Sequence, residues 1–355
     1  MKQTLASLND LKTLPFDDII DVRAPSEYAE DHVPGAISLP VLSDAERAEV
    51  GTVYVQQDPF LARKMGAALV ARNAAAHLQG PLADRTGAWR PLVYCWRGGQ
   101  RSGSFASILA QIGWRVGLID GGYKSYRRLV VRAMYEDPLP LRLILLDGGT
   151  GTAKTRILSH LAAQGQQVLD LEEMAQHRGS LLGGWPQGQP AQKSFESRVA
   201  MALADMDPTR PIFVEAESNK IGARMVPPSL WKAMIRAEHV QITAPLQARA
   251  AYLVDTYADL LQDAAALDDK LGVLAQFHGY EQVAEWRKMA HEGAFTTLAA
   301  ALVRRHYDPG YQRSSRRAGP ALLEVSLKTL DAPALQDAAH QIAKLSSKQA
   351  GPAPR

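Results

Sequence analysis

The 355-residue chain is poor in the features that mark several protein classes. It contains one cysteine, so it can form no internal disulfide and no metal site built from several cysteines. No apolar run reaches the roughly 18 residues of a membrane-spanning helix, and the first residues show no apolar signal-peptide core. The chain has 40 lysines and arginines and 37 aspartates and glutamates. The resulting net charge of +3 does not by itself predict nucleic-acid binding. We therefore expect a cytoplasmic protein without a membrane partner, in which a free thiol persists.

The single cysteine, Cys95, lies in an unusual loop. A buried strand is predicted before it, at residues 91–94, and a helix that includes residues 105–112 is predicted after it. Backbone N–H groups are free at such a strand-to-helix junction, and the helix dipole is positive there, which favours a thiolate. A lone cysteine is more often a small buried apolar residue, but a structural cysteine needs no such loop. The loop contains Arg97, Gly98, Gly99 and Arg101.

Four segments, in order along the chain, resemble the rhodanese (sulfurtransferase) family. Cys95 and Arg101, with five residues between them, resemble the active-site loop of that family. The resemblance implies that Cys95 carries sulfur or selenium as a persulfide or perselenide, with Arg97 and Arg101 holding the anionic donor. The other three matching segments are residues 19–28, 32–40 and 118–123.

A second motif begins after a short linker. An apolar strand is predicted from residue 141, and it leads into a segment close to the phosphate-binding pattern G-x-x-x-x-G-K-[ST], which a helix follows. Backbone N–H groups of such a loop wrap a phosphate, Lys154 would bridge the terminal phosphates, and Thr155 would ligate Mg²⁺. Ala153 replaces the usual glycine, which is tolerable if its backbone stays in the right-handed helical region. The segment comprises Gly148, Gly149, Thr150, Gly151, Thr152, Ala153, Lys154 and Thr155.

Four polar residues further along are candidates for contact with the phosphate-bearing ligand. His177 and Arg178 begin the segment 177–185, whose glycines and polar residues suggest a mobile loop over the phosphate site. We expect the two residues to contact the ligand, because arginine suits phosphate. Glu215 and Glu217 follow a predicted strand, where ligand sites of parallel sheets gather, and Glu215 would support the Mg²⁺ shell through water. An ordinary surface turn and an ordinary strand end are the alternative interpretations.

Two basic stretches are candidate RNA-binding surfaces. In each, tyrosines interleave with basic residues and are able to stack on bases. A solvated helix face is an equally good interpretation of both stretches. The basic residues are Lys124, Arg127 and Arg128 in the first stretch, and Arg313, Arg316 and Arg317 in the second.

Strands alternating with helices predict an α/β protein with parallel sheets in both halves. We expect a rhodanese-like domain at residues 1–135, a linker at 136–140, and a P-loop domain like that of NTPases at 141–346. A helical insertion is expected at about 246–305, and a flexible tail at 347–355.

A rhodanese-like domain followed by a P-loop domain, together with residues 95–99, 177–180 and 306–309, closely resembles the tRNA 2-selenouridine synthase family. The resemblance implies a tRNA-modifying enzyme that converts wobble 2-thiouridine into 2-selenouridine with selenium from selenophosphate. It also implies an S-geranylated intermediate made from geranyl diphosphate, and contact with the enzyme that produces selenophosphate. Two alternatives remain open at this point: an ATP-dependent sulfurtransferase acting on RNA or a small molecule, and a non-catalytic sensor. Whether the phosphate loop binds geranyl diphosphate or a nucleotide also remains open.

Overall fold

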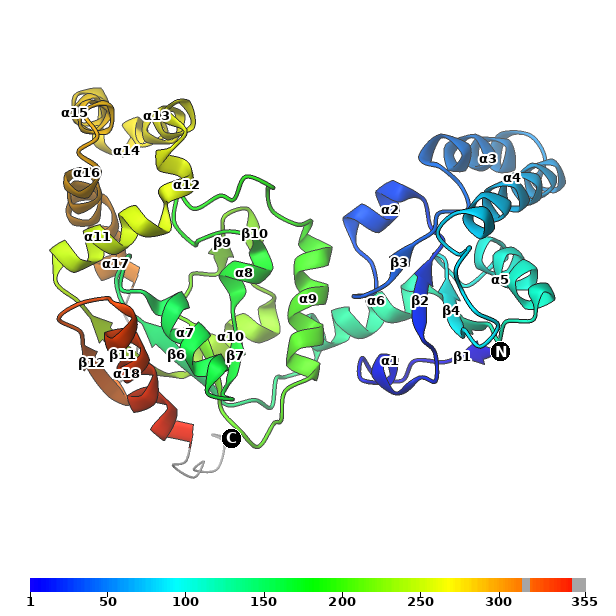
Figure 1. Ribbon diagram of the computed structural model, residues 1–355, viewed down its shortest axis with the longest axis horizontal. Coiled ribbons are helices and arrows are strands. Elements are labelled where there is room, and N and C mark those ends of the chain that lie inside the picture. The colour runs from blue at the N-terminus through cyan, green and yellow to red at the C-terminus, as the bar shows by residue number, and fades with distance from the viewer. Residues whose placement is uncertain (315–319, 347–355) are drawn as a thin grey trace. The chain divides into compact units, whose positions relative to one another are not determined.

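The structure is a computed structural model that describes residues 1–314 and 320–346, without the side chains of residues 312–314. It divides into two compact units, each with its own parallel sheet (Figure 1). This confirms the expected α/β fold class with a parallel sheet in each half of the chain. The chain passes from the first unit to the second between Pro138 and Leu139, within the predicted linker.

The first unit is built around a five-stranded sheet in the order β1-β5-β4-β2-β3, with all neighbours parallel. The central strand β4 is buried along its whole length, as its unbroken apolar run predicts. The elements of this unit are β1 (Lys2–Gln3), α1 (Asp10–Thr13), β2 (Asp18–Asp21), α2 (Pro25–Glu30), β3 (Ile37–Ser38), α3 (Asp44–Gln56), α4 (Pro59–Gln79), β4 (Pro91–Tyr94), α5 (Gln100–Ile112), β5 (Gly117–Ile119), α6 (Tyr123–Val131), the π-helix η1 (Arg132–Glu136) and α9 (Gln192–Ala204).

Helix α9 belongs to the first unit, although its sequence lies within the segment predicted to be the P-loop domain. The chain leaves the second unit after Gln189 and returns to it at Met206. Polar side chains of α9 account for this placement, because Glu196 accepts hydrogen bonds from Arg127 of α6 and from Tyr135 of η1. Glu196 is 1% exposed. The domain layout is therefore discontinuous, which hydrophobic periodicity alone does not reveal.

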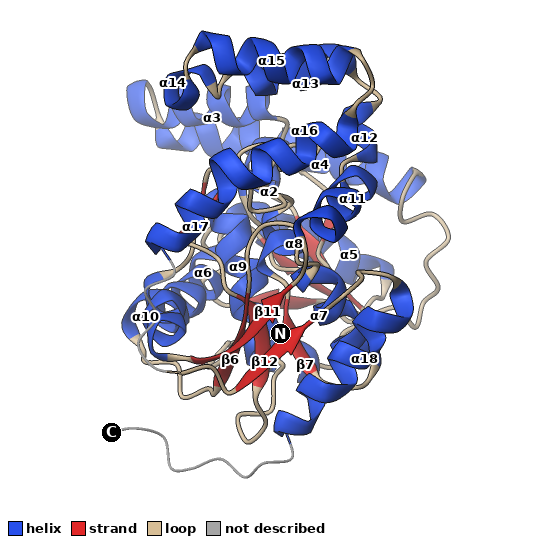
Figure 2. Cartoon of the chain, turned by 90° about the vertical axis from the view of Figure 1, so that its left-hand side faces the viewer, coloured by secondary structure: helices blue, strands red, loops and turns tan. Residues whose placement is uncertain are grey.

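The second unit contains a parallel sheet in the order β12-β11-β6-β8-β7. Figure 2 shows α7 and α18 beside its strands, and their apolar side chains form one core with β6, β8 and β11. The elements are β6 (Leu143–Asp147), α7 (Lys154–Ala163), β7 (Gln167–Leu169), α8 (Leu171–Ala175), β8 (Ile212–Glu215), β9 (Lys220–Ile221), β10 (Arg224–Met225), α10 (Pro228–Arg236), β11 (Glu238–Thr243), β12 (Leu323–Ser326), α18 (Ala332–Ala343) and the 3-10 helix η3 (Lys344–Ser346).

A helical segment lies between β11 and β12, close to the predicted insertion. It has an apolar core of its own, centred on the fully buried Trp286 and Leu271. Within the described residues, no helix is both long enough and apolar enough to cross a membrane. The helices are α11 (Leu246–Thr256), α12 (Ala258–Leu261), α13 (Ala264–Gly272), α14 (Ala275–His278), α15 (Tyr280–His291), α16 (Phe295–Leu302), the π-helix η2 (Val303–Tyr307) and α17 (Asp308–Ser314).

The anchoring of α9 predicts a large stability effect at Glu196. Replacing Glu196 with alanine removes the nearer of the two carboxylates beside the half-buried Arg127, leaving only Asp31 at 3.9 Å, and should lower the free energy of unfolding by roughly 3 kcal/mol. Denaturant unfolding followed by circular dichroism measures the change. The matched control is Glu30→Ala, which removes the exposed ion pair with Lys193 and should cost less than about 1 kcal/mol. Equal losses in the two variants would contradict the anchoring role of Glu196.

Candidate functional site

Cys95 follows the central strand β4 and precedes α5. Its side chain is 4% exposed and packs at the edge of the core with Val93 and Phe105. The hydroxyl of Ser102, in the first turn of α5, donates a hydrogen bond to Cys95 Sγ over 3.1 Å. Ser102 was not among the residues predicted from sequence. Its position seven residues after the cysteine, facing back from the next helix, is the signal that would have found it.

Glycines hold the loop after Cys95 in a curled conformation. Gly98 has φ +64°, and a Cβ there would lie 2.8 Å from the carbonyl oxygen of Ile119. Gly122 has φ +60°, and a Cβ on it would lie 2.2 Å from the carbonyl oxygen of Cys95. The N–H of Tyr123 donates to that same carbonyl over 2.8 Å. The closing motif at residues 118–123 therefore fixes the backbone of the cysteine loop, and only glycine fits at these two contacts.

The two arginines of the loop have different surroundings. Arg97 is exposed. Arg101 is half-buried and donates to Glu27 of α2 over 2.7 Å. Burial alone would raise the pKa of Glu27, but its hydrogen bond with Arg101 lowers it. Glu27 also contacts Arg47 over 3.1 Å, so one carboxylate serves two arginines and offsets the charge of Arg101 only in part. Arg97 is thus the more exposed cation of the loop, and the contact of both arginines with an anion stays a prediction.

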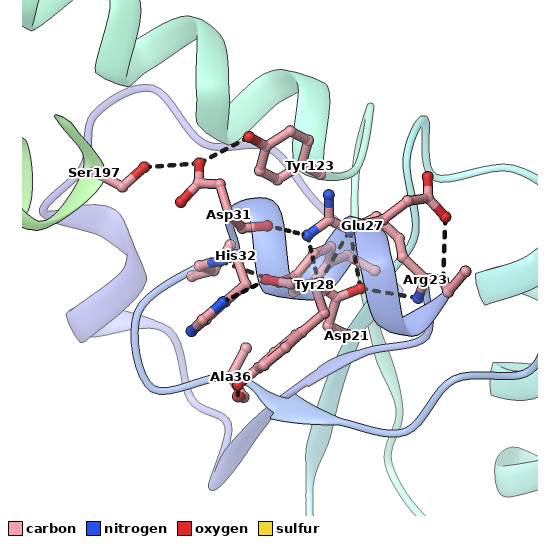
Figure 3. Close-up of polar contacts among 12 residues, drawn as sticks. Asp21, Arg23, Glu27, Tyr28, Asp31, His32, Ala36, Tyr123 and Ser197 are labelled. Carbon is pink, nitrogen blue, oxygen red and sulfur yellow. Dashed lines mark hydrogen bonds and ion pairs between the residues drawn. The ribbon is translucent and has the colours of Figure 1, made fainter. Parts of the chain in front are cut away.

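A buried polar network lies beside this loop (Figure 3). Arg23, 1% exposed, forms an ion pair with Asp21 over 2.7 Å and stacks on the ring of Tyr123 at 4.0 Å. Asp31 accepts hydrogen bonds from Tyr123 over 2.7 Å and from Ser197 of α9 over 2.8 Å. Burial raises the pKa of Asp31, and these hydrogen bonds oppose that rise. The network ties β2, α6 and α9 together. It is joined to the cysteine loop by Tyr123, whose N–H donates to the carbonyl oxygen of Cys95.

In the second unit, the predicted phosphate loop connects β6 to α7. Lys154 begins the helix, and its Nζ donates to the carbonyl oxygen of Gly148 over 2.7 Å, so the side chain folds back over the loop. Thr155 Oγ1 donates to Glu172 over 3.0 Å. β6 is the middle strand of its sheet. Open α/β sheets bind ligands beyond the carboxyl ends of their strands, which is where the phosphate loop follows β6.

Ala153 does not meet the condition under which we expected an alanine to be tolerated. That condition was a right-handed helical backbone, but Ala153 has φ +62° and ψ 28°, in the left-handed region. That region costs a residue with a Cβ roughly 1–2 kcal/mol. The methyl group is nevertheless 3% exposed and packs in the core of the sheet, which offsets part of this cost. The loop therefore keeps the backbone of the glycine-containing pattern without its glycine.

Arg249 and Asp308 support the phosphate loop from the helical segment. Arg249 donates to the carbonyl oxygen of Thr150 over 2.9 Å and forms an ion pair with Asp308 over 2.6 Å. A Cβ on Gly149 would lie 2.8 Å from Arg249 Nη2, so the loop backbone and this guanidinium are in close contact. The segment 306–309, which contributes to the family resemblance, thus reaches the phosphate loop through Asp308.

Three carboxyl groups gather beside Lys154: Glu215 is buried, whereas Glu172 and Glu217 are half-buried. Burial, followed by the charge of Glu217, raises the pKa of Glu172 to about 8, while Lys154 and Thr155 oppose the rise. Burial also raises the pKa of Glu217 and of Glu215. Glu215 is fully buried, accepts from the N–H of Glu172 over 2.8 Å, and is not among the residues that line the pocket described below. Its expected contact with a ligand shell is therefore corrected to a supporting role behind Glu172.

The residues beside Lys154 fit Mg²⁺ only in company with a phosphate ligand. In the described part of the chain, no group of three or more histidine, cysteine or acidic side chains is arranged to hold a metal ion. Mg²⁺ usually takes one or two carboxylates and completes its shell with phosphate oxygens and water. The hydroxyl of Thr155 and the carboxylate of Glu172 would supply the protein ligands, and the ion would neutralise charge on a bound diphosphate.

The segment at residues 177–185 closes over these carboxylates. Gly179 has φ +67°, and a Cβ there would lie 2.5 Å from a carboxylate oxygen of Glu172. Arg178 lines the pocket, pairs with Asp259 over 3.0 Å and stacks on Tyr257. His177 is 8% exposed, does not line the pocket, and joins Gly184 in an antiparallel bridge. His177 therefore shapes the loop and does not face the pocket, whereas Arg178 faces the pocket from its ion pair with Asp259, and its contact with a ligand stays a prediction.

These elements enclose one large pocket of about 1040 Å³. The phosphate loop forms one wall, the acidic groups and the 177–185 segment form a second, and the helical segment forms a third. Its lining includes Lys154, Thr155, Glu172, Arg178, Glu217, Tyr257, His278, His306 and Tyr307.

The predicted RNA-binding residues are only partly available. Lys124 and Arg128 are exposed on α6, whereas Arg127 pairs with Glu196. The expected stacking of tyrosines on bases is corrected for this helix, because Tyr123 and Tyr126 are 2% and 0% exposed. Arg316 and Arg317 lie outside the described residues, as does the side chain of Arg313.

Comparison with known proteins defines the class first. Residues 2–129 match the family model of the rhodanese-like domain, and residues 141–283 match that of the tRNA 2-selenouridine synthase AAA domain. The chain thus joins a rhodanese-like domain with a cysteine loop to a phosphate-binding α/β domain.

Full-length relatives then define the family. A tRNA 2-selenouridine synthase from Nitrosomonas europaea is 35% identical over 263 residues, which cover 72% of this chain and 68% of the relative. The enzyme of the same name from Hahella chejuensis is 32% identical over 349 residues, covering 91% and 87%. The one from Proteus mirabilis is 35% identical over 269 residues, covering 73% and 71%. The chain belongs to the tRNA 2-selenouridine synthase family.

The raised pKa of Glu172 predicts a pH-dependent stability. A carboxyl group whose pKa rises from 4.5 to about 8 on folding stabilises the fold fully below pH 4.5, and this contribution is lost as the pH rises through 8. The free energy of unfolding of the ligand-free protein should therefore fall between pH 5 and pH 8. Glu172→Gln should flatten this decline in denaturant unfolding at several pH values. Glu173→Gln, which removes an exposed neighbour on the same helix, is the control; an unchanged slope in Glu172→Gln would refute the assignment.

Proposed function

We propose that this protein modifies tRNA by converting 2-thiouridine at the wobble position into 2-selenouridine. The observation that carries the proposal is the presence in one chain of two sites with complementary chemistry: a thiol in a glycine-shaped loop after β4, and a phosphate loop after β6 that faces a 1040 Å³ pocket. Membership of the tRNA 2-selenouridine synthase family supports the substrate and the product.

The phosphate loop serves the first step, transfer of a geranyl group from geranyl diphosphate to the thiouridine sulfur. The sulfur attacks C1 of the geranyl group, the carbon–oxygen bond breaks, and pyrophosphate leaves with the bonding electrons. The proton on the adjacent ring nitrogen passes to solvent. Lys154 and the backbone N–H groups of the loop stabilise the charge that develops on the leaving pyrophosphate. Geranylation is useful chemically because a thiolate leaves carbon more readily than sulfide does.

Cys95 serves the second step as the selenium carrier. Its sulfur attacks the selenium of selenophosphate, the selenium–phosphorus bond breaks, and the electrons leave with phosphorus as phosphite. The resulting perselenide adds to C2 of the uracil ring and expels the geranylthiolate, which takes a proton from solvent. A small thiol then cleaves the sulfur–selenium bond at Cys95 Sγ, which frees 2-selenouridine, and a second thiol reduces the mixed disulfide. Arg97 would hold the donor anion, and the enzyme that makes selenophosphate would supply it.

Replacing Cys95 with alanine separates the two steps. The variant should lose selenium incorporation and keep geranylation, because the phosphate loop does not involve the thiol. The measurement is mass spectrometry of nucleosides from tRNA incubated with protein, geranyl diphosphate and selenophosphate. Loss of both products in a folded variant would show that the two steps do not use separate sites.

Replacing Lys154 with alanine should have the opposite effect. Removal of one group that stabilises charge in a transition state costs roughly 10²–10³ in rate, so S-geranylated nucleoside should form slower by about that factor. Lys328→Ala, which removes an exposed lysine of the same unit, should leave the rate unchanged. An unaltered geranylation rate in Lys154→Ala would remove the phosphate loop from the mechanism, and tRNA-dependent ATP hydrolysis would favour an ATP-dependent sulfurtransferase.

A further inference from the structure

A second, apolar cavity opens in the helical segment beside the phosphate loop. It lies among α11, α12, α13 and α16, and we call it the apolar cleft. Among the described residues that line it, all but a threonine and two tyrosines have side chains made only of hydrocarbon. Typical members are Val254, Leu260, Leu267, Leu298, Ala299 and Leu302.

The apolar cleft adjoins the phosphate site directly. Thr150, a residue of the phosphate loop itself, lines both the large pocket and the apolar cleft. Leu253, Tyr257 and Tyr307 also line both cavities. The hydroxyl of Tyr257 is hydrogen-bonded to Ser180 on the side of the large pocket, over 2.7 Å, so its polar end is already satisfied. A molecule held at the phosphate loop can therefore extend into the cleft without crossing a polar barrier.

The chemistry of the lining selects the kind of ligand. A nucleotide base carries ring nitrogens and amino or carbonyl groups, and burying these without partners is costly. The hydrocarbon side chains of the cleft offer no such partners, whereas a branched hydrocarbon chain needs none. A diphosphate head at the loop with an apolar tail in the cleft matches the two adjoining surfaces.

The lining of the cleft is partly buried and partly open. Leucines such as Leu267 and Leu298 belong to the buried core of the helical segment, whereas Leu253, Val254 and Leu261 are only half-buried around the cleft. Apolar side chains that border a gap lose dispersion contacts with the missing neighbours. A ligand of matching chemistry would restore those contacts.

We infer that the apolar cleft holds the prenyl chain of the diphosphate substrate, with the pyrophosphate at Lys154 and the reacting carbon near Thr150 and Tyr257. This inference rests on the proposed function and specifies where its co-substrate lies. The cavity is narrow, about 50 Å³, so part of a ten-carbon chain must move the half-buried side chains at the rim. Chain length should therefore affect affinity strongly, and a chain longer than geranyl should be disfavoured.

Binding to the full-length protein tests the inference. Each buried methylene contributes about 0.8 kcal/mol, or about fourfold in affinity. Isothermal calorimetry should therefore show geranyl diphosphate binding at least about tenfold more tightly than dimethylallyl diphosphate or inorganic pyrophosphate. Ala299→Phe, which fills the cleft from α16, should abolish this preference and leave the affinity for pyrophosphate unchanged. Thr296→Phe, an exposed position on the same helix, is the matched control and should keep the preference.

A second variant changes the cleft in the opposite direction. Phe295→Ala enlarges it and should raise the affinity for the fifteen-carbon farnesyl diphosphate relative to geranyl diphosphate by about tenfold. If Ala299→Phe and Phe295→Ala both bind geranyl and farnesyl diphosphate as the unaltered protein does, the cleft does not hold the chain, even though geranyl transfer to tRNA continues. If the unaltered protein neither binds geranyl diphosphate nor geranylates tRNA, the proposed function itself fails.

Discussion

The second unit depends on the confinement of several carboxyl groups beside one lysine. Glu172 and Glu217 lie in the wall that faces Lys154, and Glu215 lies behind them, fully buried. Repulsion and burial both disfavour the charged forms, which raises their pKa values. A diphosphate with a divalent cation, bound as proposed above, would change this balance, because the cation would attract the carboxylates and Lys154 would attract the phosphates. Gly179 lets the covering segment approach the carboxylate of Glu172 closely.

The first unit uses the opposite arrangement, in which nearly every buried charge has a partner. Arg23 is paired with Asp21, Arg101 with Glu27, and Arg127 with Glu196. Buried pairs contribute little net stability but are costly to break, so they favour one arrangement of the surrounding segments. Here they fix the backbone around Cys95 and leave Arg97 as the exposed cation of the loop. The loop around Cys95 is therefore held mainly by backbone contacts and by ion pairs from neighbouring segments.

The helical segment between β11 and β12 gives the phosphate loop its context. Arg249 and Asp308 hold the loop from one side, and Leu253 packs against Gly151. The same helices form the apolar cleft. A phosphate loop by itself recognises only phosphate, so the neighbouring helices decide what may be attached to that phosphate. In the proposed function, this division would let a loop pattern shared with nucleotide-binding proteins serve a donor of different chemistry.

Local pattern was enough to predict much of this protein. The buried strands at Pro91–Tyr94 and Leu143–Asp147, the loops that follow β4 and β6, and the passage between the units all lie where apolar runs and glycines indicate. These features depend on residues close together in the sequence. Long-range contacts decided the rest: α9 joins the first unit through Glu196, Arg101 pairs with Glu27, Tyr123 and Tyr126 turn inward, and Ala153 adopts the left-handed region. The sequence by itself determined which chemical groups are present and which loops hold them. Only the tertiary structure decided which of these groups are free to act, because charge pairing and burial arise between segments far apart in the chain.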